Sequence, residues 1–556
     1  MIIDARRAGL PERIEANVAI VGGGPAGITL ALALADAGRD VVLIEAGGDR
    51  FDKVGQDFLR AQSVSPPAHS PGEMYRRRQL GGTSAVWGGR CIPFDPIDFE
   101  TRDWMPAARW PIAYEEVARF YPQAMALAEA GAAEFTAAAA EPRLDPAMPD
   151  AGADTVVERI ERFSHPTDFG GWYRKRLTEA ARLRVLTHAA VEQILTDDEG
   201  ATATGVRLRL EGDTRVIVAA STVVVAAGGI ETARLLLASD EARSGGLGNE
   251  HDLVGRYYQC HLEGTLGTIA FHPPAGHAHF DYFRSHDGIY CRRYLWLAPE
   301  AQRRERLAGM VLRPAHPGIV DPAHRHPVLS AMYLAKNMIV PEYARKMTAL
   351  EHDARARRGG SSASFHAAHL RNVLLGAPRL AAFGIDWTRR RILARRKLPS
   401  VLLAERGGVY PLDLNGEQEP HRDSRVMLGE QRDPSGMRRA IIDWRCTADD
   451  RARMIAGVRT IAAAVNRSGT ATITLGDAEA EAWSDHPVPV GGHHIGTARM
   501  ADTPTDGVCD ANAEVFGTRG LYIAGAAAFP TSSFANPTLT LLALTLRLAE
   551  HLRASR

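Results

Sequence analysis

The sequence predicts a mixed α/β (α+β) fold, with one domain built on a parallel sheet and a second built on an antiparallel sheet. Two similar patterns stand far apart in the chain, at 17–34 and 520–552, and each consists of a short apolar run, glycine and an Ala/Leu-rich segment. Between them, 262–445 contains short apolar segments typical of antiparallel strands. With 556 residues, the chain is too long for one ordinary core. We therefore expect a discontinuous first domain over 14–261 and 486–556 and a second domain over 262–485, with 92–165 as a lid or connecting excursion.

The overall composition excludes several classes of protein. Lys+Arg and Asp+Glu are equal at 66 each, so the sequence lacks the positive excess typical of nucleic-acid-binding proteins. The five cysteines are scattered and form no CxxC pair, which argues against a disulfide framework or a metal site and favours a reducing compartment. No apolar run approaches the ~18 residues of a membrane span, and the N-terminus lacks the apolar region of a signal peptide. We therefore expect a cytoplasmic protein with no membrane span, nucleic-acid partner or metal.

The segment NVAIVGGGPAGITLALALADAGRDVVLIEAGG predicts a strand, a turn, a helix and a second strand. Gly22, Gly24 and Gly27 have the GxGxxG spacing, which allows a tight turn, close approach to a pyrophosphate and close packing of helix on strand. The helix N-terminus then faces the anion. Glu45 follows Gly27 by 18 residues, where an acid can accept both ribose hydroxyls. These features predict a Rossmann-like dinucleotide-binding domain and leave FAD and NAD as alternatives.

Two later segments extend this domain. Residues 203–220 predict a hairpin, followed by the buried strand TVVVAAGG and the helix IETARLLLAS. Near the C-terminus, the strand LYIAG precedes a helix that begins at Pro537, and Asn536 stands where a ligand's polar edge could meet the helix N-terminus. A nucleotide domain closed by its own C-terminal strand and helix is common in flavoproteins, so this arrangement favours FAD.

Taken together, these segments resemble the glucose–methanol–choline (GMC) family of FAD-dependent oxidoreductases nearly from end to end. Four separated motifs support the resemblance, in the family's order: VGGGPAG at 21–27, LGGTSAVWGG at 80–89, VVVAAGGIETARLLL at 223–237, and HHIGTARM with GLYIAGAAAFPTSSFANPT. The second motif and the ANPT ending are most similar to sugar-oxidising branches such as pyranose oxidase and bacterial sugar dehydrogenases.

The resemblance implies that residues from all four motifs and one further strand contact FAD. The implied contacts are Gly22, Gly24 and Gly27 at the pyrophosphate, Glu45 at the adenosine ribose, Val191 at the adenine, Gly82 and Thr83 at the phosphates, Trp87 and Gly88 near the flavin ring, and Gly525, Asn536 and Thr538 at the flavin edge. Some sugar oxidases of the family attach FAD through a histidine in the second motif. The matching residue here is Val86, which cannot form that bond, so we predict non-covalent FAD.

The histidine pair in GGHHIGTARM contains the candidate catalytic base. Alcohol oxidation requires a group that takes the hydroxyl proton, and histidine, with an unperturbed pKa of ~6.5, suits that task near neutral pH. The family's catalytic histidine stands three residues before the glycine of the GT pair, which selects His493 over His494. The resemblance places the second active-site residue at Asn536, and we interpret His494 as structural. The flanking glycines would let the backbone approach a flavin: Gly491, Gly492 and Gly496.

The middle of the chain gives fewer indications. GTLGTIAF and GIYCRRYLWL predict strands of the antiparallel sheet, and SRVMLGEQRDPSGMRRAIIDW predicts a further strand pair around the turn RDPSG. A single helix is expected over AYEEVARFYPQAMALAEAG. Four polar residues are candidates for a pocket wall, although we expect ordinary surface placement for each: His261, Glu417, Gln418 and His421.

Residues 355–397 are strongly basic, with leucine, isoleucine and aromatic residues interleaved. We interpret this segment as one or two amphipathic helices with a solvated face. The alternative is a docking patch for an acidic electron acceptor or a membrane surface. The arginines that begin it are Arg355, Arg357 and Arg358.

We therefore expect an FAD-dependent enzyme that oxidises a hydroxyl of a sugar, glycoside or polyol to a carbonyl. In this scheme His493 takes the proton, flavin N5 takes the hydride and Asn536 orients the alcohol, while oxygen or a quinone or protein acceptor reoxidises the flavin. The alternatives are the same chemistry on an aromatic, long-chain or amino alcohol, a non-redox flavin-containing lyase, an NAD-dependent dehydrogenase, and an inert binding protein.

Overall fold

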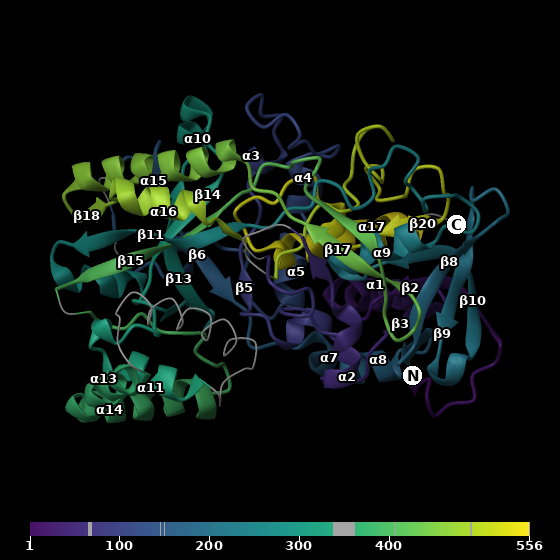
Figure 1. Cartoon of the computed structure of the whole chain (residues 1–556), viewed down its shortest axis with the longest axis horizontal. Coiled ribbons are helices and arrows are strands. Elements are labelled where there is room, and N and C mark those ends of the chain that lie inside the picture. The colour runs from purple at the N-terminus through teal and green to yellow at the C-terminus, as the bar shows by residue number, and fades with distance from the viewer. Residues whose placement is uncertain are drawn as a thin grey trace.

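Two large sheets stand side by side along the long axis of the molecule (Figure 1). The computed structural model describes residues 1–64, 69–144, 146–148, 151–336, 362–405, 407–489 and 492–554. Gly491, Arg355, Arg357 and Arg358 lie outside the described residues. Within these ranges, no helix is both long and apolar enough to cross a membrane.

The first sheet contains the strands of the N-terminal pattern. Its order is β1 (Ile2–Asp4), β7 (Leu183–Thr187), β3 (Val41–Ile44), β2 (Arg13–Val21), β10 (Arg215–Val225), β9 (Ala203–Arg209) and β8 (Ala190–Thr196). The pairs from β1 to β10 are parallel, whereas β10, β9 and β8 are antiparallel. The hairpin predicted at 203–220 is thereby confirmed. The C-terminal strand β20 (Leu521–Ile523) returns to this sheet and pairs in parallel with the end of β10.

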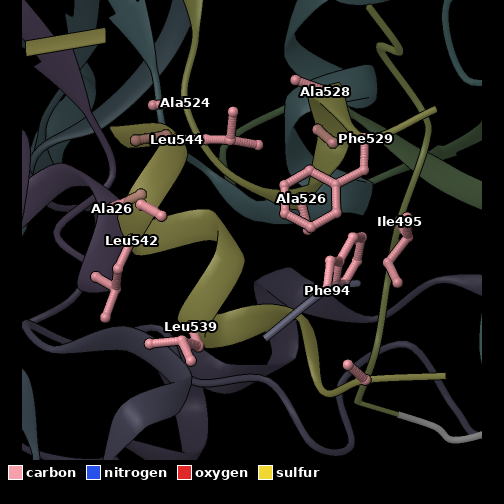
Figure 2. Close-up of a cluster of buried hydrophobic side chains, with 14 of the residues drawn as sticks. Ala26, Phe94, Ile495, Ala524, Ala526, Ala528, Phe529, Leu539, Leu542 and Leu544 are labelled. Atoms are coloured by element: carbon pink, nitrogen blue, oxygen red, sulfur yellow. The ribbon is translucent and has the colours of Figure 1, made fainter. Parts of the chain in front are cut away.

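Three helices accompany this sheet: α1 (Pro25–Asp36), α9 (Gly228–Ala238) and α17 (Pro537–Ala554). Each follows a strand that ends in glycine or a short loop, as predicted. α1 packs directly on α17, and Figure 2 shows Ala26 of α1 beside Leu542 of α17. The C-terminal helix therefore closes the N-terminal domain, although more than 500 residues separate the two helices in the chain.

The second sheet is antiparallel. Its order is β18 (Ala471–Thr474), β11 (Leu262–Phe271), β15 (Val409–Gly416), β14 (Met310–Pro314), β13 (Tyr290–Leu297), β6 (Val156–Phe163) and β5 (Arg90–Cys91), with β12 (Phe283–Arg284) on β13 and β19 (Val488–Pro489) on β11. The strands predicted at GTLGTIAF and GIYCRRYLWL are β11 and β13. Helix α15 (Ala448–Ser468) lies along one side of this sheet, with α16 (Asp477–Asp485) packed on β11 (Figure 1).

Three expectations about the middle of the chain require correction. The strand pair β16 (Arg425–Arg432) and β17 (Arg438–Asp443) forms as predicted, but in a separate small sheet with β4 (Gln62–Ser63), where both strands pack against α9. The single helix expected over 113–131 is two short helices, α4 (Tyr114–Ala118) and α5 (Tyr121–Leu127), because Pro122 can start a helix but cannot continue one. Residues 92–165 include β6, so they are more than a lid or connection; the domain boundaries remain a proposal.

The other helices are short or lie apart from the sheets. They are α2 (Lys53–Gln56), α3 (Pro96–Phe99), α6 (Ala137–Ala140), α7 (Phe169–Trp172), α8 (Arg174–Glu179), α10 (Pro299–Glu305), α11 (Pro327–Leu334), α13 (Ser362–Leu375) and α14 (Ala377–Trp387). α11, α13 and α14 lie on the side of the second sheet opposite α15 (Figure 1). The described part of the basic segment is therefore helical, as expected.

Candidate active site

The glycine turn after β2 excludes a side chain at one position and leaves space at another. A Cβ on Gly27 would overlap the carbonyl oxygen of Gly22, so only glycine lets α1 lie this close to the strand end. A Cβ on Gly24, which precedes α1, would meet no protein atom within 4 Å. The N-terminus of α1 therefore opens onto free space, as a pyrophosphate site requires.

The second glycine motif lies against the first. The Gly81 N–H donates to the carbonyl oxygen of Gly23 at 2.7 Å, and a Cβ on Gly82 would come within 3.0 Å of the Gly24 Cα. Thr83 is partly exposed in the 3₁₀ turn that begins at Gly82. The structure thus brings together the two motifs predicted to meet the phosphates.

Trp87 and its neighbours follow that turn. The Trp87 Nε1–H donates to the carbonyl oxygen of Thr167 at 3.0 Å, and its ring meets Phe169 edge-on, which fixes the indole. Val86 and Gly88 on either side are exposed. The residues predicted to face the flavin therefore keep accessible surface.

Glu45, at the end of β3, is buried and held by two backbone amides. Its carboxylate accepts hydrogen bonds from the N–H groups of Gly23 at 2.9 Å and Gly47 at 2.7 Å. Burial raises the pKa of this carboxyl group. Glu45 lines a cavity of about 150 Å³ together with Gly22 and Val191. Glu45, predicted for the ribose, therefore shares one cavity with Gly22 and Val191, which are predicted for the pyrophosphate and the adenine.

His493 lies in an extended segment that pairs with the residues before β11. The Gln259 N–H donates to the Ile495 carbonyl oxygen at 2.9 Å, and the Ile495 N–H donates back at 3.1 Å. Counting two residues forward from Gln259 and two residues back from Ile495, this antiparallel register sets His261 opposite His493. Two histidines that are distant in sequence are therefore neighbours.

The same segment then turns toward the loop after β20. Gly496 has a φ of 87°, and a Cβ there would lie 2.5 Å from the Tyr257 carbonyl oxygen, so this position requires glycine. Its N–H donates to the Ala526 carbonyl oxygen at 3.0 Å. Figure 2 shows Ile495 close to Phe94 and Phe529, and the rings of Phe94 and Phe529 meet edge-on with centroids 5.4 Å apart. These contacts join the histidine segment to the loop that ends at Asn536.

Three hydrogen bonds surround the two histidines. Nδ1 of His493 lies 2.7 Å from Nδ1 of His261, and Nε2 of His493 lies 3.1 Å from Nδ2 of Asn536. Nε2 of His261 lies 2.9 Å from the carbonyl oxygen of Ser532. Asn536 directly precedes α17, so the helix N-terminus and the histidine segment meet here, as predicted.

These partners determine where the protons lie. The Ser532 carbonyl can only accept, so Nε2 of His261 carries a proton and its Nδ1 is an acceptor in the neutral ring. Nδ1 of His493 must then donate to His261, which leaves Nε2 of His493 with a free lone pair. The Asn536 amide N–H donates to that lone pair. His493 is therefore a neutral imidazole whose basic nitrogen faces Asn536.

The surroundings keep both histidines neutral. Burial lowers the pKa of His493 well below its ordinary value of 6.5, and the positive charge of Arg90 lowers it further. Burial also lowers the pKa of His261 to about 4. Both imidazoles are thus neutral near pH 7.

A polar network holds the loop that supplies Ser532 and Asn536. The Ser533 Oγ–H donates to Asp98 at 2.8 Å, the Asn415 amide donates to the Phe534 carbonyl oxygen at 2.7 Å, and the Gln418 N–H donates to Ser532 Oγ at 3.1 Å. All of these side chains are buried. The loop is therefore fixed from several directions, which holds the histidine partners in place.

Three polar residues expected at the surface are buried instead. His261, Glu417 and Gln418 have no exposed surface, whereas His421 is partly exposed. His261 contacts the predicted base, Glu417 forms a double hydrogen bond with Arg102, and Gln418 bonds the loop that bears Asn536. These roles could not be predicted from the sequence, because these partners of His261, Glu417 and Gln418 lie more than 100 residues away along the chain.

The remaining predicted residues surround the same region. Gly525 and Thr538 are partly exposed among buried neighbours, and a Cβ on Gly525 would meet no protein atom within 4 Å. His494 lies with its ring parallel to that of Tyr258, centroids 6.2 Å apart. Gly492, like His493 and His494, is partly exposed.

Comparison with known proteins identifies the family. Residues 17–324 match the family described as FAD dependent oxidoreductase, and residues 420–545 match the family described as GMC oxidoreductase. The chain is a GMC-type FAD-dependent oxidoreductase. The choice between FAD and NAD, which the glycine turn left open, is thereby decided for FAD.

Several relatives of this oxidoreductase are characterised proteins. A 2-methyl-1,2-propanediol dehydrogenase of Mycolicibacterium austroafricanum is 22% identical over 97% of this chain and 95% of its own length. A C-glycoside 3-oxidase of Microbacterium trichothecenolyticum is 38% identical over 16% of this chain, and that match spans only 18% of the relative. The solved structure of pyridoxine 4-oxidase from Mesorbium loti has a TM-score of 0.56 at 16% identity, covering 97% of this chain and all of the neighbour. The similarity to this structure shows the shared fold.

The described residues of the oxidoreductase fit FAD. The free space beside Gly24, the cavity at Glu45 and Val191, and the space beside Gly525 lie at positions implied for pyrophosphate, adenosine and flavin edge. Among the described residues, Oδ1 of Asn536 is buried and has no hydrogen-bond partner. A buried acceptor without a partner at this position is expected to accept a hydrogen bond from a bound ligand.

Proposed function

We propose that this enzyme oxidises a hydroxyl group of a sugar, glycoside or polyol to a carbonyl, with His493 as the general base and non-covalent FAD as the cofactor. The observation that supports this most directly is the unprotonated Nε2 of His493, which accepts a hydrogen bond from the Asn536 amide at 3.1 Å. A base and a hydrogen-bond donor this close together can hold one alcohol oxygen between them.

In the proposed reaction, the substrate hydroxyl donates its proton to Nε2 of His493 while its oxygen accepts a hydrogen bond from the Asn536 N–H. The bond from His493 Nδ1–H to His261 holds the imidazole in the tautomer that leaves Nε2 free. Bound FAD supplies the acceptor, at N5 of its flavin ring, for the hydride that leaves the alcohol carbon. Once it has taken the proton, His493 carries a positive charge that the His261 Nδ1 lone pair stabilises.

The orphaned Oδ1 of Asn536 favours a substrate with more than one hydroxyl. With the N–H side of the amide directed at the reacting oxygen, Oδ1 can accept from a second donor, such as a neighbouring hydroxyl. The C-glycoside 3-oxidase relative supports a sugar or glycoside. The diol dehydrogenase relative, which matches nearly the whole chain, favours a small non-sugar diol as the second candidate.

The proposed cofactor contacts are those implied by the sequence, and Val86 is the reason for proposing non-covalent FAD. Its aliphatic side chain, 41% exposed beside Trp87, has no atom that could bond to the flavin. Flavin should therefore leave the protein on acid precipitation. Colour that stays in the precipitate would contradict non-covalent binding.

We further propose a cytoplasmic enzyme that oxygen or a quinone or protein acceptor reoxidises. The reducing compartment is supported by Cys91, Cys260, Cys291, Cys446 and Cys509, all of which are free thiols in the structure.

The test of the base is His493→Ala, with His494→Ala as the matched neighbour. Removal of a positioned base should slow anaerobic flavin reduction by roughly 10²–10⁴-fold, while the flavin absorbance of the purified variant stays that of the wild type. His494→Ala should reduce flavin at a rate close to wild type. Equal losses in both variants, or an unchanged rate in His493→Ala, would refute the assignment.

The amide is tested by Asn536→Ala. This variant loses one hydrogen bond to a reacting, polarised oxygen, which is worth about 1.5–3 kcal/mol, so the reduction rate should fall by less than in His493→Ala. Stopped-flow absorbance with saturating substrate gives the comparison. A larger loss in Asn536→Ala than in His493→Ala would contradict the assignment of His493 as the general base.

A further inference from the structure

Residues 317–336 and 362–405, here called the helical arm, form a small unit on one side of the second sheet. The arm contains α11, α13, α14 and a π-helical turn at Thr388–Leu393. It has its own apolar cluster, separate from the main core, which includes Val328, Leu329, Tyr333 and Phe365. Figure 1 shows these helices set apart at the edge of the molecule.

The outer surface of the arm is unusually apolar. Half of the large hydrophobic side chains that are exposed among the described residues, seven of fourteen, lie in the arm. They are Leu334, Leu370, Leu374, Leu375, Ile385, Ile392 and Leu393. Leu374 and Leu375 are 66% and 76% exposed, so they project into solvent and are not the edge of a buried core. Singly scattered apolar residues are ordinary on a protein surface, but a concentration of this kind marks an interaction site.

The spacing of these residues places them on helix faces. Leu370 and Leu374 are four residues apart on α13, and Arg371 and Leu375 repeat the same interval one position later. Phe365 and His369 of the same helix are buried, so its opposite face packs on the arm's own core. The arm is therefore amphipathic, with a leucine-rich face outward.

The segment that carries most of these residues is strongly positive. Residues 362–397 contain one acid, Asp386, which pairs with Arg390 at 3.3 Å. The basic residues of this stretch are Arg371, Arg379, Arg389, Arg390, Arg391, Arg395, Arg396 and Lys397. In a chain with equal numbers of acids and bases, this local excess is complementary to an anionic partner.

We propose that the helical arm docks on the surface of an anionic lipid bilayer. Aliphatic side chains on convex helices, interleaved with arginines, match the chemistry of a helix lying in the interface. The leucines and isoleucines enter the acyl boundary, and the guanidinium groups remain at the level of the phosphates. The hot spots of protein interfaces are enriched in Trp, Tyr and Arg, whereas the large apolar residues exposed on this face are all leucine or isoleucine. The enzyme would thus bind the membrane surface without spanning it.

The test is co-sedimentation of the full-length holoenzyme with vesicles. Vesicles of phosphatidylcholine alone are compared with an equal mixture of phosphatidylcholine and phosphatidylglycerol, with and without added salt. The apolar variant is Leu374→Ser/Leu375→Ser/Ile392→Ser/Leu393→Ser, and the charge variant is Arg389→Glu/Arg395→Glu. Their matched controls are Val54→Ser, at a site 75% exposed outside the arm, and Arg143→Glu, at a side chain 92% exposed.

The wild type should sediment with the anionic vesicles, and salt should weaken this binding. The charge variant should lower the partition coefficient by roughly tenfold or more, since each lost basic residue contributes about fivefold near an anionic surface. The apolar variant should lower it by roughly tenfold or more as well, because it removes four aliphatic side chains from the acyl boundary. The two controls should bind like the wild type, and all variants should keep wild-type activity without vesicles. Binding by the wild type that is equal with and without phosphatidylglycerol would overturn the proposal. So would a change in oligomeric state of the apolar variant with vesicle binding intact, because the arm would then be a contact between copies of the chain.

Discussion

At the scale of residues, the geometry around His493 sets its protonation in advance of catalysis. The Ser532 carbonyl orients His261, His261 orients His493, and Asn536 faces the basic nitrogen that results. His493 and Asn536 could be predicted because both lie in recognisable local motifs. His261 could not, because its role arises from a strand register between segments that are 232 residues apart.

Two substitutions distinguish the hydrogen bond that His261 accepts from His493 from the space that the His261 ring fills. In His261→Asn, the amide oxygen can take the place of Nδ1 and accept from His493, so flavin reduction should keep most of its rate. In His261→Phe, the ring fills the space but accepts nothing, and the rate should fall by roughly tenfold or more as the tautomer is lost. Stopped-flow reduction of both variants with the same alcohol measures this difference. Equal rates in the two variants would mean that His261 only packs.

The lowered pKa of His493 predicts the acid limit of the reaction. As the proposed base, His493 would act in its neutral form, and burial holds its pKa well below 6.5, so it stays neutral as pH falls through that value. The rate of anaerobic flavin reduction should therefore be flat from neutral pH to below 6.5 and decline only in more acidic solution. A single ionisation near 6.5 in that profile would show a histidine with the pKa of a solvated side chain.

At the scale of elements, the glycine turn and its helix were predictable from local spacing, because the strand, turn and helix are consecutive in the chain. The strands that pair with later strands could not be predicted from local spacing. The strand pair at 424–444 was recognisable from its alternation and turn, but its sequence gives no signal that it joins β4 and α9 in place of the large antiparallel sheet.

Two substitutions in the glycine turn separate folding from cofactor binding. Gly24 has extended backbone, with a φ of −80°, and free space at its Cβ, so Gly24→Ala should fold normally but obstruct the pyrophosphate. Gly27→Ala places its methyl group on the Gly22 carbonyl and should lose stability of about 1–3 kcal/mol. The ratio of flavin to protein absorbance and the thermal midpoint of each apoprotein report the two effects. A fully yellow Gly24→Ala protein would show that the cofactor does not approach this glycine.

At the scale of the whole molecule, segments from both sheets meet around the loop that ends at Asn536. One apolar cluster runs through both sheets, and the buried pair Arg102–Glu417, with two hydrogen bonds of 2.7 Å, lies beneath this loop. Composition predicted two domains, but it gave no indication that the site would depend on buried charges. Glu417 was expected at the surface because charged side chains usually lie there.

Loss of Arg102 alone should destabilise the protein more than loss of both Arg102 and Glu417. Arg102→Met leaves the Glu417 carboxylate buried without its partner and should destabilise the protein by about 3–5 kcal/mol. Adding Glu417→Leu removes the stranded charge and should restore much of that loss. The temperature of flavin release in each variant checks this order. A double variant less stable than Arg102→Met would show that the carboxylate stabilises the fold without the arginine.

The proposed oxidation of a hydroxyl group, with His493 taking its proton, is tested by the visible spectrum of the purified protein, mixed anaerobically with a panel of sugars, glycosides, polyols and small diols. One of these classes should bleach the flavin band, and the same compound should leave the band of His493→Ala unchanged on the same timescale. A yellow protein that none of them bleaches, or equal bleaching in His493→Ala, would contradict it.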